Sequence, residues 1–386
     1  MTIPVAYNLR NLVVRRTTTL MTVAGIALTV SILVGDLALV SGLNAAFRSS
    51  GDPRNILVMS KGSKAEVTSQ ISRQMHHELQ SIPGIAKNES GQPMASLEIV
   101  TALTLPAVAG STDLDVAVRG VGASGIELRD GVTVNGRWFR SGQRELVVGR
   151  FIAERYAGAR IGSQLRFGRG EWEVVGIMDG RGTAIDSEIW GDLNQISSDF
   201  NRPNFLSSIL LRASDASLVP ELIRAVEDDR RLNAAAVSER DYYESQTMSG
   251  APLQYFGMFV AVVMGVGSAF AAMNTMYATV ARRTREIAML RVLGFSPGQI
   301  LVSFLSESLL LSLAGGLLGC LAILPFNNFT AGLGNLVTFS HTAFQLHINA
   351  SSVLAGIAFA LLIGVISGCL PARLASRSGL AEALRS

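Results

Sequence analysis

Charged side chains gather at one place in this chain, directly before a long apolar run. Four arginines and one acid lie close together there: Arg282, Arg283, Arg285, Glu286 and Arg291. Enrichment of arginine beside a membrane span marks the cytoplasmic side of the membrane. The pattern therefore favours a cytoplasmic surface that docks another protein, rather than a catalytic site.

The residues around these charges predict a short helix, a break and a second helix. One set of apolar residues falls on a broad face of a helical projection: Ile287, Leu290, Val292 and Leu293. Gly294 then breaks the segment, and Ser296 with Pro297 is the N-cap and first-position signal of a new helix. We expect residues 282–298 to be a docking element that passes movement to the span behind it.

Two acids, Asp36 and Glu307, lie within long apolar runs. Carboxylates inside a membrane are costly and often functional. We expect Glu307, about two turns into its helix, to bond neighbouring helix groups near the cytosolic end. We expect Asp36 to reach the outer interface. A direct role in transport is the alternative for each residue.

Glycines spaced four residues apart occur twice in the apolar runs. The two pairs are Gly315 with Gly319 and Gly364 with Gly368. Such spacing lets helix backbones approach closely in lipid. The sequence leaves open whether these residues pack within one chain or between two copies.

Other arrangements that would support chemistry are missing from the sequence. His76-His77-Glu78 lacks the His-Glu-x-x-His spacing of a zinc protease, so we interpret it as a solvated helix face. No lysine follows Lys87, and none of the three lysines lies in a P-loop. Cys320 and Cys369 are expected to stay unpaired. We therefore expect no catalytic, metal or cofactor site in this chain.

Several of these motifs together resemble the MacB/FtsX-type permeases of ABC transporters, a mechanotransmission-type family. The resemblance rests on R-x-x-E-I-A-M-L-R-x-L-G-F-S at 283–296, on Glu307 in SFLSESLLL and on the glycines of AGGLLG. NLRNLVVRRTTTLMTVAGIALTV and the terminal Pro371-Ala372-Arg373 and Glu382-Ala383-Leu384-Arg385 also match. Gly379-Leu380 departs from the family, which commonly has a proline before the last motif.

The resemblance implies roles for the charged segment. It makes 282–298 the coupling helix, with these ATPase-coupling residues: Arg282, Arg283, Arg285, Glu286, Leu290, Arg291 and Gly294. ATP and Mg²⁺ would bind a separate ATPase subunit. The alternative, a basic stop-transfer loop, explains neither Gly294 nor Glu307.

The composition indicates a membrane protein. A mean hydropathy of +0.35 with 16% charged residues is too apolar for a soluble protein of this size. The formal charge of +3 is small and the arginines cluster at the edges of apolar runs, so we expect no nucleic-acid partner.

We therefore expect an α-helical membrane protein with four transmembrane helices. A large, two-lobed α+β periplasmic domain is inserted between helices 1 and 2. The expected segments are an amphipathic cytoplasmic helix (1–17), transmembrane helix 1 (18–47), the periplasmic domain (48–244), transmembrane helix 2 (252–281), the coupling helix (282–298), transmembrane helix 3 (299–325), a periplasmic loop (326–350), transmembrane helix 4 (351–371) and a cytoplasmic tail (372–386). The first apolar run is too long for a cleaved signal peptide.

Arginine placement predicts the orientation. Every arginine-rich flank falls on one side of the spans, which puts both termini in the cytosol of a bacterial inner membrane. In the periplasmic domain, strands are expected at 55–60, 96–108 and 207–213, helices at 69–82 and 217–232, and a hairpin at 164–178 around Gly168 and Gly170.

The expected function is that of a permease subunit that couples ATP hydrolysis by a partner to movement of the periplasmic domain. Export or efflux comes first, with lipoprotein or lipid release as a further family role. Four spans suggest pairing with a second copy or a related permease. A periplasmic adaptor and an outer-membrane channel are further expected partners. The alternative is a membrane-anchored receptor whose periplasmic domain senses a ligand without transport.

Overall fold

The computed structural model describes residues 16–48, 50–105, 114–129, 131–156, 158–247, 251–335 and 340–377. The chain forms two compact units. The helical unit comprises residues 1–41, 252–329 and 346–386, and the α+β unit comprises 42–251 and 330–345. Most of the predicted N-terminal helix (1–17) and the terminal motif at 382–385 lie outside the described residues.

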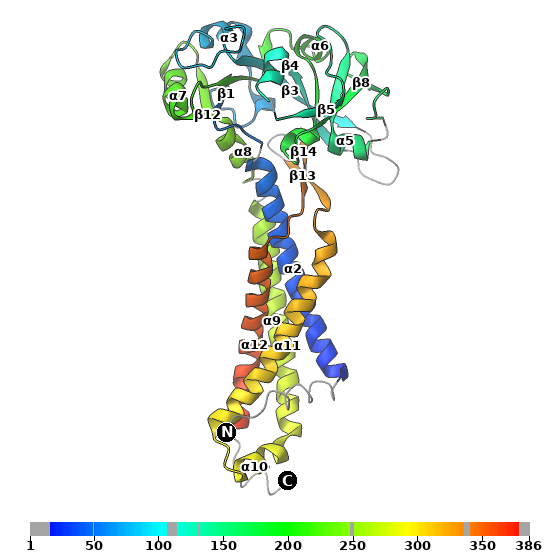
Figure 1. Cartoon of the computed structure of the whole chain (residues 1–386), viewed down its shortest axis with the longest axis vertical. Coiled ribbons are helices and arrows are strands. Elements are labelled where there is room, and N and C mark those ends of the chain that lie inside the picture. The colour runs from blue at the N-terminus through cyan, green and yellow to red at the C-terminus, as the bar shows by residue number, and fades with distance from the viewer. Residues whose placement is uncertain are drawn as a thin grey trace. The chain divides into compact units, whose positions relative to one another are not determined.

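Four long helices dominate the helical unit and lie side by side (Figure 1). They are α2 (Arg16–Arg48), α9 (Ala251–Arg282), α11 (Pro297–Ile323) and α12 (Ala350–Arg377). Each is long and apolar enough to cross a membrane, which confirms the predicted number of spans. The short helix α10 (Thr284–Val292) stands between α9 and α11, and a 3-10 turn, η5 (Leu324–Phe326), follows α11.

The α+β unit is built on one ten-stranded sheet in the order β12-β1-β11-β3-β4-β9-β6-β8-β5, with β7 paired to β8. The strands are β1 (Asn55–Ser60), β3 (Ala95–Leu105), β4 (Leu114–Val121), β5 (Thr133–Gly136), β6 (Glu145–Gly149), β7 (Gln164–Phe167), β8 (Gly170–Asp179), β9 (Glu188–Asp192), β11 (Ser208–Arg212) and β12 (Ala234–Ser238). β4 with β9 and β6 with β8 are parallel, whereas the other pairs are antiparallel. The predicted α+β architecture is confirmed.

Helices and short turns cover this sheet. The helices are α3 (Arg73–Leu79), α4 (Ala123–Glu127), α5 (Arg150–Arg155), α6 (Leu193–Asp199), α7 (Val219–Asp228) and α8 (Glu239–Thr247), with 3-10 turns η1 (Glu66–Thr68), η2 (Ala184–Ser187) and η3 (Ala216–Leu218). α3 is shorter than the predicted helix at 69–82, because β2 (Ile71–Ser72) pairs with β10 (Phe205–Leu206) and Ser72 caps α3.

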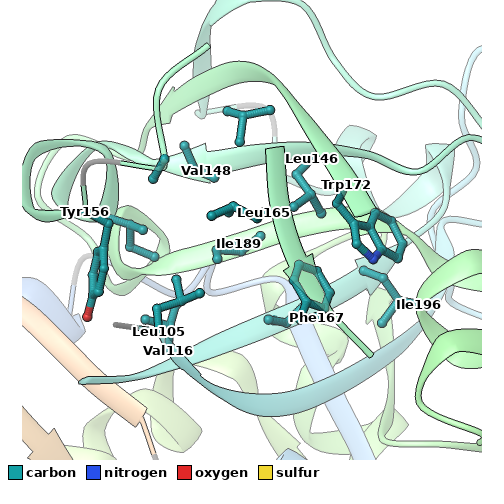
Figure 2. Close-up of a cluster of buried hydrophobic side chains, with 14 of the residues drawn as sticks. Leu105, Val116, Leu146, Val148, Tyr156, Leu165, Phe167, Trp172, Ile189 and Ile196 are labelled. Carbon is teal, nitrogen blue, oxygen red and sulfur yellow. The ribbon is translucent and has the colours of Figure 1, made fainter. Parts of the chain in front are cut away.

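Two of the hydrophobic clusters on this sheet are joined through β3. One packs Trp172 on Phe167, with ring centroids 5.2 Å apart, among strands β4, β6, β8 and β9 (Figure 2). The other packs β1, β11 and β12 against α3 and α7. Leu97 of β3 packs against both clusters, so the sheet connects the two halves of the unit.

A second hairpin was not predicted. Strands β13 (Thr330–Asn335) and β14 (Ser340–Gln345) pair within the segment expected to be a plain loop at 326–350. The hairpin belongs to the α+β unit, where Phe344 is buried. Its sequence TAGLGN carries two glycines, which weaken a strand signal, so tertiary packing decides this structure.

Candidate coupling site and the charged centre of the α+β unit

Arg283 forms a buried ion pair with Glu307 in the helical unit. Its Nη1 lies 3.1 Å from Glu307 Oε2, and the exposed fractions of the two side chains are 7% and 5%. Arg283 Nε also lies 3.8 Å from Glu286 Oε2. Arg283 stands at the junction of α9 and α10, while Glu307 lies within α11. The pair therefore fixes the start of α10 against α11.

This burial changes the interpretation of Arg283. The sequence placed it among the arginines of a docking surface, but its guanidinium faces the interior of the helical unit. Breaking a buried pair leaves an uncompensated charge and typically costs about 3–5 kcal/mol. Arg283 is thus a positioning residue for α10.

The rest of α10 divides into a buried anchor and an exposed face. Ile287 is buried in the helical core with Ile300 and Phe304 of α11. The exposed residues in α10 and directly beside it are Arg282, Arg285, Glu286, Met289, Val292 and Leu293, whereas Leu290 and Arg291 are half-buried. The predicted broad apolar face is therefore split, with Ile287 inside and Val292 and Leu293 outside.

Gly294 ends α10 in the left-handed conformation, with φ of +93°. Its N–H donates to Arg291 O, and the Phe295 N–H donates to Leu290 O at 3.1 Å. This is the Schellman pattern, which favours glycine at that position. Ser296 then caps α11, and the Gln299 side chain bonds back to the Ser296 N–H at 2.7 Å. The predicted glycine break and Ser-Pro start are both present.

The four glycines of the G-x3-G pairs all pack within this chain. A Cβ on Gly315 would lie 2.8 Å from Ile26, and one on Gly319 would lie 2.5 Å from Ala27 O, so both face α2. Gly364 and Gly368 face serines of α11, and Ser308 Oγ donates to Gly364 O at 2.7 Å. The geometry accounts for these glycines by helix packing inside one chain.

Asp36 is placed against α9. Its carboxylate lies directly beside Gly257, and a Cβ at that position would require the carboxylate to shift. The half-buried carboxylate of Asp36 thus packs against α9. Asp36 is in the second half of α2, a few residues before the α+β unit begins. Nothing in this geometry brings Asp36 and Glu307 together.

A buried ionic centre in the α+β unit was missed by the sequence analysis. Arg119 lies 2.8 Å from Glu66, 2.6 Å from Glu98 and 2.9 Å from Glu188. Arg129 adds a second contact to Glu98 at 2.6 Å. The five side chains are at most 9% exposed. They join η1, β3, β4 and β9 to the loop after α4.

Charge pairing in this centre overrides the cost of burial. Burial alone would raise the pKa of Glu98, but the guanidinium groups of Arg129 and Arg119 hold that pKa below its ordinary value. A sequence signal did exist. Arg119 interrupts an apolar strand, and residues on both faces of β4 turn out to be buried.

Glu239, at the start of α8, differs from the glutamates of the ionic centre. It is 3% exposed and accepts hydrogen bonds from Asn55 Nδ2 at 2.8 Å and from the Asp52 N–H at 3.1 Å. No arginine pairs with it among the described residues. Burial raises the pKa of Glu239, and the charge of Arg129 and the two hydrogen bonds offset this only in part.

Comparisons with known proteins agree with this architecture. Residues 19–229 match the family described as MacB-like periplasmic core domain, and residues 258–380 match FtsX-like permease C-terminal. The first match covers more than half of the chain. The first match ends just after α7, and the second begins within α9, which follows the α+β unit.

Relatives carry related names. The chain is 26% identical over 296 residues to the macrolide export ATP-binding/permease protein MacB of Bdellovibrio bacteriovorus, which covers 69% of this chain and 43% of the relative. It is 25% identical over 400 residues to MacB of Chlorobium phaeobacteroides, and the alignment covers 95% of this chain and 58% of that relative. It is 30% identical over 213 residues to the uncharacterized ABC transporter permease YknZ of Bacillus subtilis, covering 52% and 49%. The chain spans about half the length of the curated relatives it matches.

Two solved structures are similar to part of the chain. The extracellular domain of YknZ aligns with 47% of this chain and 99% of that structure, at 18% identity and a TM-score of 0.36. The alignment with the periplasmic region of MacB from Actinobacillus actinomycetemcomitans covers 51% of this chain and 94% of that structure, at 12% identity and a TM-score of 0.37. On the family matches at 19–229 and 258–380, the chain belongs to the MacB/FtsX family of ABC transporter permeases.

Proposed function

We propose that this chain is the permease subunit of an ABC transporter in the bacterial inner membrane, and that a separate ATPase docks on α10. The observation that carries the proposal is the construction of α10. Arg283 and Ile287 hold the helix from inside, while Met289, Val292 and Leu293 remain 60%, 69% and 74% exposed. A positioned helix with an exposed apolar face suits a protein interface.

Charge complements this apolar face. Arg282 and Arg285 are exposed beside it, and such cations steer and orient an acidic partner surface. Gly294 and the capped start of α11 give α10 a defined end. An ATPase that binds here acts on a helix with fixed connections rather than on a loose loop.

Movement of α10 has a physical route through the helical unit. The Arg283–Glu307 pair ties α10 to α11, and close glycine contacts tie α11 to α2 and α12. α2 begins in the helical unit and its last residues belong to the α+β unit. In this proposal, ATP hydrolysis on the partner displaces α10, and the packed helices pass that displacement to the α+β unit.

Export or efflux is the role we assign to this movement. The relatives named for macrolide export support that class, and lipoprotein or lipid release is a further role of the same mechanism. The proposed partners are the ATPase with its ATP and Mg²⁺, a second permease copy or related subunit, a periplasmic adaptor and an outer-membrane channel. The arginine-rich flanks support a cytoplasmic location for both termini.

Affinity purification of the full chain in mild detergent tests the proposal. A stoichiometric P-loop ATPase that elutes with the chain is expected, and a co-eluting adaptor would point to efflux. If no ATPase appears under several gentle conditions, the chain is better described as a receptor that senses a periplasmic ligand without transport.

A further inference from the structure

A cavity of about 380 Å³ lies within the α+β unit. Its wall combines residues from three parts of the chain, within 50–55, at 128–129 with 131–132, and within 180–185, with Arg212 and Glu239. Most of the polar wall is rigidly paired. Arg212 donates to Asn55 Oδ1 at 3.0 Å and lies 3.3 Å from Asp52 Oδ2, and Arg129 pairs with Glu98.

The cavity is close in sequence to two of the four points where the chain passes between the helical unit and the α+β unit. Ser50 and Asp52 come shortly after α2, and Glu239 opens α8, which precedes α9 in the chain. The two segments touch each other here. A Cβ on Gly51 would lie 2.8 Å from the backbone N of Arg240, and the Asp52 N–H bonds Glu239. A bound molecule would therefore contact both the segment that follows α2 and the segment that precedes α9.

Glu239 gives the cavity an acidic wall that forms no ion pair among the described residues. Its carboxylate accepts hydrogen bonds from two neutral donors, the Asn55 side chain and the Asp52 N–H. The glutamates of the nearby ionic centre each have an arginine. Burying a carboxylate without a cation is unfavourable, and an ammonium group in the cavity would relieve that cost.

Arg181 gives the cavity a basic wall. Its backbone is fixed at φ of +56°, its N–H donates to Asp179 Oδ1 at 2.8 Å, and Gly182 N–H donates to Asp186 Oδ2 at 2.8 Å. The guanidinium is exposed and pairs with no side chain among the residues that the structure describes. A rigid loop thus presents an available guanidinium, which suits a carboxylate.

Apolar side chains lie between these charges. Leu128, Val132 and Ile185 line the same cavity. A ligand that fits this wall carries an ammonium, a carboxylate and an apolar side chain. The volume is in the range that small-molecule sites occupy, roughly 300–1,000 Å³.

We propose that this cavity binds a small apolar zwitterion, a free amino acid or a dipeptide, with its ammonium on Glu239 and its carboxylate on Arg181. The site goes beyond the permease function and does not depend on it, since it uses only residues of the α+β unit. Ligand occupancy would change the contacts that hold residues 50–55 against Glu239. The cavity thereby becomes a sensing site on the segments that link the unit to α2 and α9.

Calorimetric titration of the full chain in lipid nanodiscs tests the site. The probe is the dipeptide Leu-Leu, compared with N-acetyl-Leu-Leu, which lacks the ammonium, and Leu-Leu amide, which lacks the carboxylate. Because a hydrogen bond to a charged group contributes about 1.5–3 kcal/mol, each blocked peptide should bind at least about tenfold more weakly than Leu-Leu.

Two variants assign the charges. Glu239→Gln should weaken the binding of Leu-Leu to the affinity of N-acetyl-Leu-Leu, while the affinity for N-acetyl-Leu-Leu itself stays unchanged. Arg181→Gln should weaken Leu-Leu to the level of the amide while leaving binding of the amide unchanged. Arg166→Gln, at an exposed arginine of β7 that does not line the cavity, is the matched control and should behave like wild type.

Two results would overturn the site: no saturable binding of Leu-Leu, or equal binding of all three peptides. If Glu239→Gln fails to fold in a thermal scan, the exposed Arg181→Gln still decides the question. ATPase co-purification, measured on the same variants, should be unchanged. If no ATPase co-purifies with the wild-type chain, that result counts against the permease proposal and leaves the cavity proposal unaffected.

Discussion

Arg283 Nη1 and Glu307 Oε2 lie 3.1 Å apart inside the helical unit, and this pair connects a junction between helices to the middle of a neighbouring one. Arg283 comes at the end of α9, and Glu307 lies in α11. Both residues carry the family resemblance in the sequence. Their contact gives that resemblance a physical meaning, since it sets the position of α10.

Breaking this pair should loosen α10 and release the partner. Glu307→Ala leaves the Arg283 charge buried and should destabilise the helical unit by about 3–5 kcal/mol. The double variant Arg283→Met/Glu307→Leu removes both charges and should recover most of that stability. Thermal unfolding in detergent measures the change in stability, and ATPase co-purification measures the release of the partner.

The control is Arg282→Gln, because Arg282 is exposed. It should leave the unfolding temperature unchanged. If Glu307→Ala were as stable as wild type, the pair would contribute nothing to the position of α10.

The exposed apolar face of α10 should be required for docking but not for folding. Val292→Asp/Leu293→Asp places two charges at positions that are 69% and 74% exposed, so stability should change by less than about 0.5 kcal/mol for each. Co-purification of the ATPase should be lost, because a docking partner would have to bury those charges. Ile161→Asp, at a 46% exposed site of the α+β unit, is the control and should retain the ATPase. Unchanged association of the α10 variant would exclude this face as the interface.

Elements determined by local pattern were predictable from the sequence. Long apolar runs gave four spans, and Gly168 and Gly170 marked the β7–β8 hairpin at its observed place. The Ser296-Pro297 start and the Gly294 stop were also legible, because capping depends on residues a few positions apart.

Contacts between distant residues were not predictable in the same way. Arg283 looked like its exposed neighbours, because only the fold brings Glu307 beside it. Residues on both faces of β4 are buried, and the charge of Arg119 is satisfied by glutamates from three other elements. Periodicity reports that a face is polar, and it does not report which groups meet that face.

Helix packing in the helical unit should depend on where each glycine lies. Gly315→Leu and Gly319→Leu would drive a side chain into Ile26 and the Ala27 carbonyl, so each should cost about 1–3 kcal/mol, the usual penalty of overpacking. Gly267→Leu on α9 is the matched control, because a Cβ there meets nothing within 4 Å. Thermal unfolding compares the three variants. Equal stability of all three would mean that close approach at Gly315 and Gly319 is incidental.

The hub of the ionic centre should tolerate no replacement. Arg119→Met leaves three buried carboxylates with one arginine between them and should cost at least about 3 kcal/mol. Arg119→Lys should restore little, because one ammonium cannot reproduce the planar fork that bonds all three glutamates. Arg202→Met, at a half-buried arginine without an ion pair among the described residues, is a control for the loss of charge alone. Full stability of the lysine variant would contradict the geometric argument.

Glu239 and Glu98 should give stability opposite responses to pH. Burial raises the native pKa of Glu239 above its unfolded value of about 4.3, so its stabilising contribution is present below that pH and is lost as pH rises through the native pKa. Glu239→Gln should therefore gain stability relative to wild type between acid and neutral pH.

The native pKa of Glu98 is lowered, so the stabilising contribution of Glu98 is present above about pH 4.3 and is lost as pH falls through the native pKa. Glu98→Gln should be less stable than wild type at neutral pH, by a margin that shrinks on acidification. Unfolding temperatures across this range, with exposed Glu171→Gln as control, measure both trends, and parallel profiles for all four proteins would refute the assignment.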